Sequence, residues 1–575
     1  MKLLKLHIQD EFRSLHEGFR IDFHKNTDSM DTFQPFCFAG LNGSGKSNVL
    51  EALAAIFYHL EFCVSKFRPQ SFDKHFKRHI STPDAYTLEY LIGKKNEYPS
   101  TSNNLVKIVI IKERKTPPTI FVYSRLTDEV PDLTMPLNQT ENNEGAKLYL
   151  PDLVVAYSSG ENEILSLPFI KNRLINFDKY CEDYKKNEIF VEPESSLIYI
   201  DEGMSQAVLL AALLFEDKNT LKPLKKELGI LKLQSFSIKL TNHFLSFKKE
   251  KSNAIKHPIL EHIYQIIEKL KLCSTSCYET NFLQGHGGTT REFPPNIISL
   301  DFYADEATKT AFKTHFSTSF ELFRFFQVLY ELNSNIVSES IKEEVYSSKG
   351  FYTKGKLPGA APIDTVFHFL DYKILKKIKG KKEPKALLLR EFSDGEQQFL
   401  HTIGICLMLK DRRTLLLLDE PETHFNPSWR AKFIKILNDS IHAGRLKNLP
   451  NGDFNVHLLK DVILTSHSPF IISDCMPNNV IFFDRNKETE LVEAKSAKEL
   501  EFNTFGASVE DILDELFDYN QSIGDWSKQE LLDITFDEIK TKKDVDQAKH
   551  KLRILGSSIE KDIVLTKLNR INPKD

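Results

Sequence analysis

The chain has 575 residues, too many for one ordinary domain, and 41% of them are apolar and 27% charged. This composition is typical of a globular protein and excludes a disordered chain. The formal net charge of −4 argues against a protein that coats nucleic acid by bulk charge, although it leaves room for local basic patches. Seven scattered cysteines are typical of reduced thiols, and no apolar run is long enough to cross a bilayer. We therefore expect a cytoplasmic protein without a membrane segment.

The first predicted element is a phosphate-binding loop between a strand and a helix. Residues 40–47 read G-L-N-G-S-G-K-S and fit the pattern G-x-x-x-x-G-K-[ST]. Apolar residues 36–39 precede the loop like a buried strand, and residues 48–57 follow it with helical spacing. A glycine-rich turn before a helix is the alternative, and this strand-loop-helix context makes it the minority interpretation.

Such a loop surrounds phosphates with backbone N–H groups, and the helix N-terminus adds positive potential at the same point. We expect Lys46 to reach the β- and γ-phosphates and the Ser47 hydroxyl to hold Mg²⁺. The nucleotide-binding residues predicted here are Asn42, Gly43, Ser44, Gly45, Lys46, Ser47 and Asn48.

A large insertion is predicted next, because Ser47 and the next nucleotide-binding motif at Ser393 stand 346 positions apart. Helical apolar spacing covers residues 205–215, 257–272 and 307–332, and glycines predict a loop over residues 281–288. Prolines interrupt the segment and no a/d heptads are sustained, which excludes a long coiled coil. The insertion is therefore expected to be compact and mostly helical.

The only dense basic run of the chain lies at residues 373–382. A solvated hairpin tip is the default interpretation, because nothing aromatic within the run could stack on bases. A contact with the phosphate backbone of a nucleic acid is the alternative. The run lies just before the motif at Ser393, so such a contact could influence ATP engagement.

Residues 392–397 read F-S-D-G-E-Q and precede an apolar helical stretch. Ser393 with Glu396 three residues later is a capping box, which predicts a helix N-terminus at this point. A capped helix N-terminus can also meet phosphate, so the two interpretations are compatible.

Two further strands are predicted to end in polar residues. The four leucines at 415–418 predict a buried parallel strand that delivers Asp419 and Glu420 to its carboxyl end, where open α/β sheets bind ligands. We expect Asp419 to lie on the magnesium side and Glu420 to act as general base toward the attacking water. A simple turn into a proline is the alternative. Residues 462–465 predict another strand, after which His467 could donate to the γ-phosphate.

In this order the segments resemble one split cassette of the ABC-type AAA ATPases in the SMC/RecF/OLD branch. The opening residues 1–8 and 12–15 also resemble the first strands of that branch. The resemblance implies ATP and Mg²⁺ as cofactors. It further implies that Ser393, Gly395 and Glu396 form the signature, although the second and fourth signature positions depart from the transporter form.

In the family, the signature binds the γ-phosphate held by the other subunit. The resemblance therefore implies a head-to-tail homodimer or a higher even oligomer. The Q-loop position of the family falls after the strand expected near residues 153–158, and since no glutamine stands there, Glu161 or Asn162 would have to serve. Pro168 follows too soon for a long helix behind this segment.

The expected fold class is α/β, an ABC-type ATPase head split by a large, mostly helical insertion and followed by a helical C-terminal extension. Lobe I is expected over residues 1–165, the insertion over 166–385, lobe II over 386–485 and the extension over 486–575. The predicted helices of the extension are 508–517, 527–539 and 545–568, the last with a break near Gly556.

OLD nucleases carry a Toprim domain in the C-terminal position, with a D-x-D motif on a strand. Asp544 and Asp546 match that short motif, but lysines surround them and no apolar strand precedes them. We interpret the segment as a solvated helix face and expect no intrinsic nuclease.

The combination of motifs most closely resembles the Septu-type antiphage ATPases (PtuA) and those that accompany retrons. This resemblance implies an ATP-hydrolysing regulatory ATPase of bacterial antiphage defence that controls a separate effector nuclease of HNH type. Nucleic acid such as retron DNA or RNA is a further implied partner. The alternatives are a RecF/SMC-like DNA-repair clamp and an OLD-type ATPase-nuclease.

Overall fold

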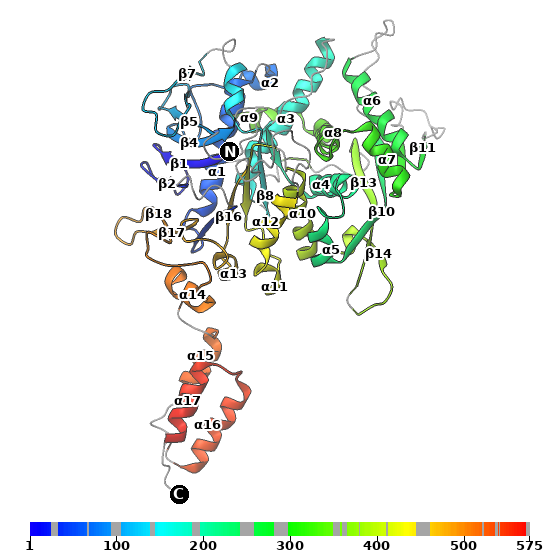
Figure 1. Ribbon diagram of the computed structural model, residues 1–575. Coiled ribbons are helices and arrows are strands. Elements are labelled where there is room, and N and C mark those ends of the chain that lie inside the picture. The colour runs from blue at the N-terminus through cyan, green and yellow to red at the C-terminus, as the bar shows by residue number, and fades with distance from the viewer. Residues whose placement is uncertain are drawn as a thin grey trace.

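The structure is a computed structural model of the 575-residue chain (Figure 1). It describes all residues except 25–32, 66–67, 94–104, 139–143, 161, 187–195, 242–257, 281–296, 349–356, 359–364, 379, 410–411, 444–459, 520–522, 535–538, 540 and 571–575.

A seven-stranded sheet at the centre of the head joins the two ends of the chain. Its strand order is β18-β17-β3-β16-β15-β8-β9, and all neighbours are parallel except the pair β17 and β18. The strands are β3 (Phe36–Gly40), β8 (Leu153–Ser158), β9 (Leu197–Tyr199), β15 (Thr414–Asp419), β16 (Lys460–Thr465), β17 (Val480–Arg485) and β18 (Val492–Ser496). The predicted strands before the phosphate loop, before the two acids and before His467 are all confirmed, and they lie side by side as β3, β15 and β16.

A second, antiparallel sheet covers one side of this core, with strand order β2-β1-β4-β5-β6-β7. Its strands are β1 (Lys2–Ile8), β2 (Arg20–Asp22), β4 (Tyr86–Gly93), β5 (Leu105–Lys112), β6 (Thr119–Tyr123) and β7 (Leu133–Pro136). Helix α1 (Lys46–Val64) follows the phosphate loop and packs in one hydrophobic cluster with strands of both sheets. By length and composition α1 could cross a membrane, but 78% of it is buried inside the head, as expected of a core helix.

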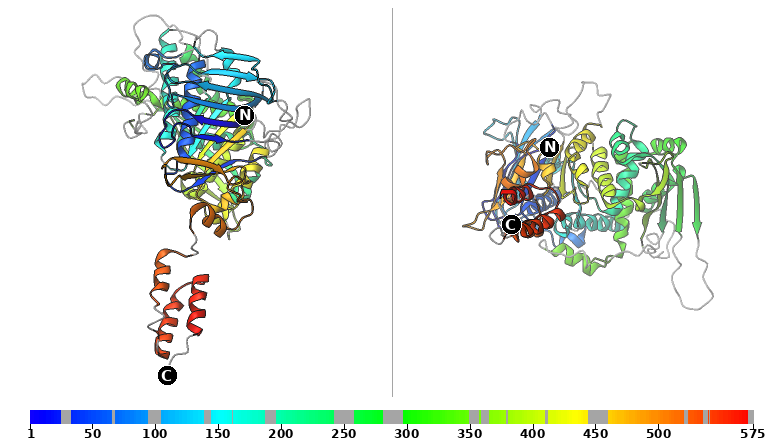
Figure 2. Two further views of the ribbon diagram at one scale, coloured as in Figure 1. Left: turned by 90° about the vertical axis from the view of Figure 1, so that its left-hand side faces the viewer. Right: turned by 90° about the horizontal axis from the view of Figure 1, so that it is seen from below.

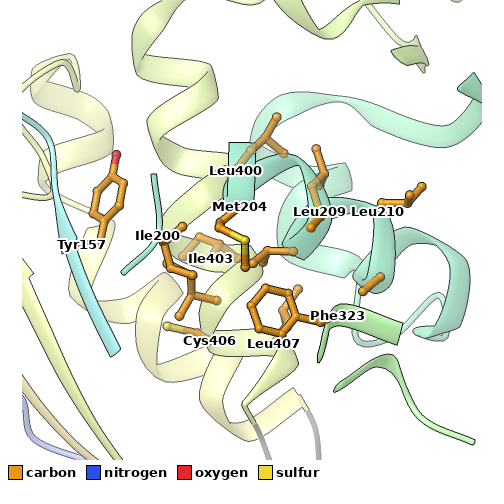
Figure 3. Packing of buried hydrophobic residues seen from close by; sticks show 14 of the residues in the cluster. Tyr157, Ile200, Met204, Leu209, Leu210, Phe323, Leu400, Ile403, Cys406 and Leu407 are labelled. Atoms are coloured by element: carbon orange, nitrogen blue, oxygen red, sulfur yellow. The ribbon is translucent and has the colours of Figure 1, made fainter. Parts of the chain in front are cut away.

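The other side of the central sheet is covered by helices. Helix α10 (Asp394–Met408) packs against α4 (Glu202–Phe215) and α12 (Phe433–Ala443). Figure 3 shows their interface, where Met204 and Leu209 of α4 meet Leu400, Ile403 and Leu407 of α10. Short helices α2 (Gln70–Asp73), α11 (Pro427–Arg430) and α13 (Pro469–Ile472) complete the head. The insertion and the head therefore share one core.

The described part of the insertion contains more helix than strand. Its helices are α3 (Glu163–Lys186), α4, α5 (Lys222–Leu228), α6 (Pro258–Cys273), α7 (Glu306–His315), α8 (Ser319–Glu331) and α9 (Glu339–Ser347). The insertion also forms an antiparallel sheet that the sequence did not predict, in the order β11-β12-β10-β13-β14. Its strands are β10 (Ile230–Thr241), β11 (Ser276–Thr280), β12 (Ile297–Tyr303), β13 (Phe367–Lys376) and β14 (Lys385–Leu388). The described residues of the basic run lie on β13 and between β13 and β14, which pair as a hairpin in agreement with the prediction.

Two helix predictions in this region are wrong in detail. The helix expected over residues 307–332 is split into α7 and α8, because Thr318 caps α8 with its hydroxyl on the Glu321 N–H at 3.0 Å. Pro168 does not prevent a long helix, since it lies inside the 24-residue α3. The proline removes one hydrogen bond near the start of the helix, where buried neighbours hold α3 in place. The loop expected over residues 281–288 lies outside the described residues.

The part of the chain that leaves the head begins further along the sequence than the boundary predicted at residue 486. Strand β18 completes the central sheet, and α14 (Val509–Phe517) buries Ile512 and Leu516 in the core of the head. Beyond it, α15 (Asp525–Leu532), α16 (Lys542–Ile554) and α17 (Ile559–Arg570) have a small core of their own and project from one end of the head (Figures 1 and 2). The predicted break near Gly556 is confirmed.

Candidate functional site

Three glycines give the phosphate loop its shape. Gly40, Gly43 and Gly45 all have positive φ, at 137°, 75° and 98°. A Cβ atom on Gly40 would lie 2.2 Å from the backbone oxygen of Phe483 in β17, and one on Gly45 would lie 2.8 Å from the Ser14 Oγ. Neither position can accept a side chain without moving its neighbours, so the loop is held tightly between β17 and the segment after β1.

Lys46, the first residue of α1, folds back over the loop. Its Nζ donates to the backbone oxygens of Gly40 at 2.9 Å and Leu41 at 2.8 Å. Burial lowers the pKa of Lys46 to about 8, and the carboxylates of Glu420 and Asp419 oppose that shift. The ammonium therefore points toward the space that the loop encloses, where phosphate would be its partner.

This pKa predicts a pH dependence of nucleotide binding. Below pH 8 Lys46 is charged and ready for phosphate, whereas above pH 8 binding must first take up a proton. We expect ATP to bind about tenfold more weakly at pH 9 than at pH 7, as measured by titration calorimetry in two buffers of different ionisation enthalpy. Lys46→Arg, whose guanidinium stays charged, should bind with an affinity that is flat over this range, even if it is lower. An equally steep decline in Lys46→Arg would assign the effect to another group.

Asn48 links the start of α1 to the segment after β1. Its Oδ1 accepts from the Ser14 Oγ at 2.6 Å, and its Nδ2 donates to Glu51 at 3.1 Å. Burial raises the pKa of Glu51 to about 7. The other loop residues differ in exposure: Ser44 is buried, whereas Asn42 lies exposed at the tip.

Asp419, at the end of β15, connects three segments that are far apart in sequence. Its Oδ1 accepts from the Ser47 Oγ and the Thr465 Oγ1, both at 2.8 Å. Its Oδ2 accepts from the Asn162 Nδ2 at 2.8 Å and faces the Ser158 Oγ at 3.5 Å. The Ser47 hydroxyl and the Asp419 carboxylate are hard oxygen ligands of the kind that Mg²⁺ takes, so they fit the predicted ion.

Glu420 follows in a strained conformation that turns it toward His467. Its φ is 46°, in the left-handed region that a glutamate rarely adopts, and its N–H donates to the Thr465 Oγ1 at 2.9 Å. Its Oε1 lies 3.4 Å from the His467 Nε2, and hydrogen bonding from His467 lowers the pKa of Glu420. Both side chains remain partly exposed, so the carboxylate is ionised and accessible to water.

Thr465 was part of a predicted strand, but the sequence assigned it no role. In the structure its hydroxyl accepts from the Glu420 N–H and donates to Asp419, so one side chain positions both acids. Its place at the carboxyl end of β16, next to β15, is the signal that could have identified it. Of the two Q-loop candidates, Asn162 reaches Asp419, and Glu161 lies outside the described residues.

The signature segment starts α10 with the predicted capping box. The Ser393 Oγ accepts from the Glu396 N–H, and the Glu396 Oε2 accepts from the Ser393 N–H at 3.3 Å. The other Glu396 oxygen forms an ion pair with Lys376 of β13. A Cβ atom on Gly395 would lie 2.6 Å from the backbone oxygen of His424, so glycine allows α10 to approach the loop after Glu420 closely.

The structure brings the phosphate loop, the two acids and His467 together, whereas Ser393 makes no hydrogen bond to them among the described residues. The Ser393 side chain is exposed, and its hydroxyl accepts from the Glu396 N–H of the capping box. Gln398, one turn further along α10, was not predicted to matter. Its Oε1 accepts from the His424 N–H at 3.0 Å, which joins the signature helix to the loop that carries Glu420.

Part of the chain is similar to a known family of protein domains. Residues 320–473 match the family model described as an AAA domain, putative AbiEii toxin, Type IV TA system. The matched segment contains α10, Asp419 at the end of β15, Glu420 after it, and His467. It is similar to an AAA domain. No curated protein matches the chain.

Among solved structures, the chain is similar to several SMC head domains. The head domain from Thermotoga maritima shares 9% identity at a TM-score of 0.30, over 86% of this chain and 99% of that one. An Smc head from Pyrococcus furiosus, with an extended coiled coil and bound to the C-terminal domain of ScpA, shares 11% identity at a TM-score of 0.31, over 87% and 98%. At these values the likeness adds nothing to the site, which rests on this chain's own contacts.

Proposed function

We propose that this chain is an ATP-hydrolysing regulatory ATPase of a bacterial antiphage defence system and that it controls a separate effector nuclease. The observation that carries the ATPase part is the convergence of Ser47, Asp419, Glu420 and His467 at one edge of the central sheet. The AAA match over the C-terminal half of this site supports the same conclusion.

In this proposal, Lys46 leaves the backbone oxygens of its own loop and binds the β- and γ-phosphates. Ser47 and Asp419 would hold Mg²⁺, which supplies neutralisation of the phosphate charge when it is bound. Glu420 orients the attacking water and takes its proton on a carboxylate oxygen, and His467 keeps that carboxylate in place. Asn162 senses the same site through Asp419.

We further propose that Ser393 and Gly395 complete the site of an opposing subunit in a head-to-tail homodimer. The exposed position of Ser393 at the N-terminus of α10 supports this arrangement. The N-terminus of the 15-residue α10 would then meet the γ-phosphate of the partner.

Two features of the C-terminal helices support the control of a separate effector: the place of the D-x-D motif on a helix, and exposed apolar side chains. Asp544 accepts from the N–H and hydroxyl of Thr541, both at 2.8 Å, in the capping box that starts α16. Asp546 follows on the same helix and not at a strand end, which opposes the OLD-type alternative. Trp526 and Ile554 of these helices are 83% and 81% exposed, and such apolar side chains favour a protein partner over plain solvent.

The test compares the purified chain with the complex that it forms with its operon partner. Alone, the chain should hydrolyse ATP but leave DNA and RNA uncut in Mg²⁺ or Mn²⁺. With the partner, cleavage should depend on whether ATP, ADP or no nucleotide is bound, because only differential contacts can restrain and release an effector. Removing residues 520–575 should uncouple the two activities while it leaves α14 in the core of the head.

Three outcomes would contradict the proposal. Metal-dependent cleavage by the chain alone that is lost in Asp544→Ala would favour the OLD-type nuclease. ATP-dependent closure on duplex DNA without any protein partner would favour the RecF/SMC-like clamp. Equal nuclease activity of the complex with ATP, with ADP and without nucleotide would contradict the regulatory role.

A further inference from the structure

The antiparallel sheet of the insertion has two very different faces. One face buries Phe236, Leu300, Phe302 and Ile374 against α7 and other helices. Strand alternation places the residues between them on the opposite face, where β10 presents Ser235, Ser237 and Lys239. Figure 1 shows this sheet at the side of the head, next to α7. We call this second surface the outer face.

Two exposed tyrosines lie on the outer face. Tyr278 of β11 is 52% exposed and pairs with Ser299 of β12. Tyr303, four residues further along β12, is 50% exposed and pairs with Ser235 of β10. At strand spacing the two rings are roughly 13 Å apart along the sheet. An exposed aromatic ring on an open sheet is a surface on which an unpaired base can stack.

Lysines continue this surface on the neighbouring strands. Lys373 of β13 pairs with Ser235 of β10, so it lies two strands away from Tyr303 in the same row. Lys239 lies in the row of Tyr278, because both pair with Ser299. The outer-face lysines are Lys232, Lys239 and Lys373. The exposed Lys377, Lys381 and Lys382 extend the positive charge between β13 and β14. In a chain of net charge −4 this is a local reversal of sign.

Few acidic residues lie on this surface, and the central one accepts hydrogen bonds from neighbouring hydroxyls. Asp301 of β12 accepts from the hydroxyls of Ser237 at 2.6 Å, Tyr278 at 2.8 Å and Ser276 at 3.2 Å. These hydrogen bonds satisfy its carboxylate and hold the Tyr278 ring on the face. Asp371 and Glu383 are exposed nearby, against six lysines.

We propose that the outer face binds single-stranded nucleic acid, with bases stacked on Tyr278 and Tyr303 and the phosphate backbone along the lysines of β10, β13 and the following turn. Positive charge beside spaced, exposed aromatic rings fits a chain of phosphates and unpaired bases. A duplex fits poorly, because its bases are already stacked on each other and cannot reach the rings.

Strand β13 connects this surface directly to the signature. Lys373 and Lys377 are exposed, whereas Lys376 forms its ion pair with Glu396 of the capping box and lies 4.4 Å from the centre of the Phe392 ring. A nucleic acid bound on the outer face would therefore bias the position of α10. This inference deepens the proposed function, since it gives the regulatory ATPase the chemical class of its signal.

The experiment measures binding of a fluorescein-labelled dT20 oligonucleotide to the full chain by anisotropy, without nucleotide, so that the result does not depend on ATPase activity. Tyr303→Ala should weaken binding about tenfold, and Tyr303→Phe should bind like the parent because it keeps the ring. Lys373→Gln should reduce the dependence on salt. Tyr519→Ala, at a tyrosine 39% exposed outside the sheet, is the matched control and should change nothing. Thermal unfolding checks that each variant folds.

ATPase measurements then test the connection to the signature. dT20 should change the rate of the parent, and Lys376→Gln should bind dT20 normally but lose that response. Binding of U20 with the same dependence on Tyr303 also supports the proposal, because RNA shares the chemistry. Three results would overturn the proposal. A 20-base-pair duplex could bind as tightly as dT20, Tyr303→Ala could bind dT20 like the parent, or neither dT20 nor U20 could bind. The last result, with ATP hydrolysis intact, would point to a protein ligand and leave the proposed ATPase standing.

Discussion

Glu420→Gln is expected to leave ATP binding intact and to lower hydrolysis by at least about a hundredfold, the scale of losing a positioned general base. The amide keeps the size of the side chain and its contact with His467 but cannot take the proton of the attacking water. The left-handed φ of 46° and the bond to Thr465 come from the backbone, so the substitution should not disturb them. Single-turnover hydrolysis and calorimetric ATP binding separate the two effects.

Two matched substitutions sharpen this test. Lys46→Ala should weaken nucleotide binding itself, since it removes the phosphate-binding ammonium. Glu501→Gln, at an exposed glutamate that also has a left-handed φ, of 59°, should leave both quantities unchanged. Hydrolysis by Glu420→Gln at the parental rate would show that the end of β15 has been assigned wrongly.

Mixing two inactive variants should restore ATPase activity if the signature acts across subunits. Lys46→Ala removes phosphate binding, whereas Ser393→Arg places a bulky cation at the N-terminus of α10 and blocks its approach to a partner. A mixed dimer would hold one intact composite site, made from the phosphate loop of one chain and the signature of the other. We expect partial recovery that peaks near equal amounts of the two chains, measured as phosphate release.

Two controls define the outcome of mixing. Each variant must retain the thermal unfolding temperature of the parent. A double variant that carries both changes must stay inactive when it is mixed with either single variant, because no such pair contains both an intact phosphate loop and an intact signature. No recovery at any ratio between folded chains would count against a shared site and would leave each head to act alone.

The head was predictable from sequence because its motifs are local. Four consecutive leucines, two acids and a proline identify a strand end without any knowledge of its neighbours, and Ser393 with Glu396 identifies a helix start within four residues. The fold class followed from the order of these segments. What the local pattern did not contain was the second role of Thr465, which depends on β16 lying beside β15.

The sheet of the insertion was missed for the same reason. Strands β10 and β13 pair across more than a hundred residues, and β10 is interrupted by register shifts that disturb its alternation. The basic run contains no aromatic residue, so nothing in its local pattern associates it with Tyr278 or Tyr303. Only the pairing of β11 with β12, of β12 with β10 and of β10 with β13 places those rings on the same sheet face as Lys373.

The position of β3 in the central sheet has a consequence for how the chain folds. Both neighbours of β3, β16 and β17, come from residues 460–485, whereas β3 itself ends at Gly40. The strand that feeds the phosphate loop therefore has two unpaired edges until nearly the whole head has been synthesised. Parallel pairing over such a separation is slow, and a bare apolar strand is prone to pair with other chains. Refolding from denaturant should accordingly be slow and cooperative, and its yield should depend on protein concentration. ATP binding should be among the last native properties to return.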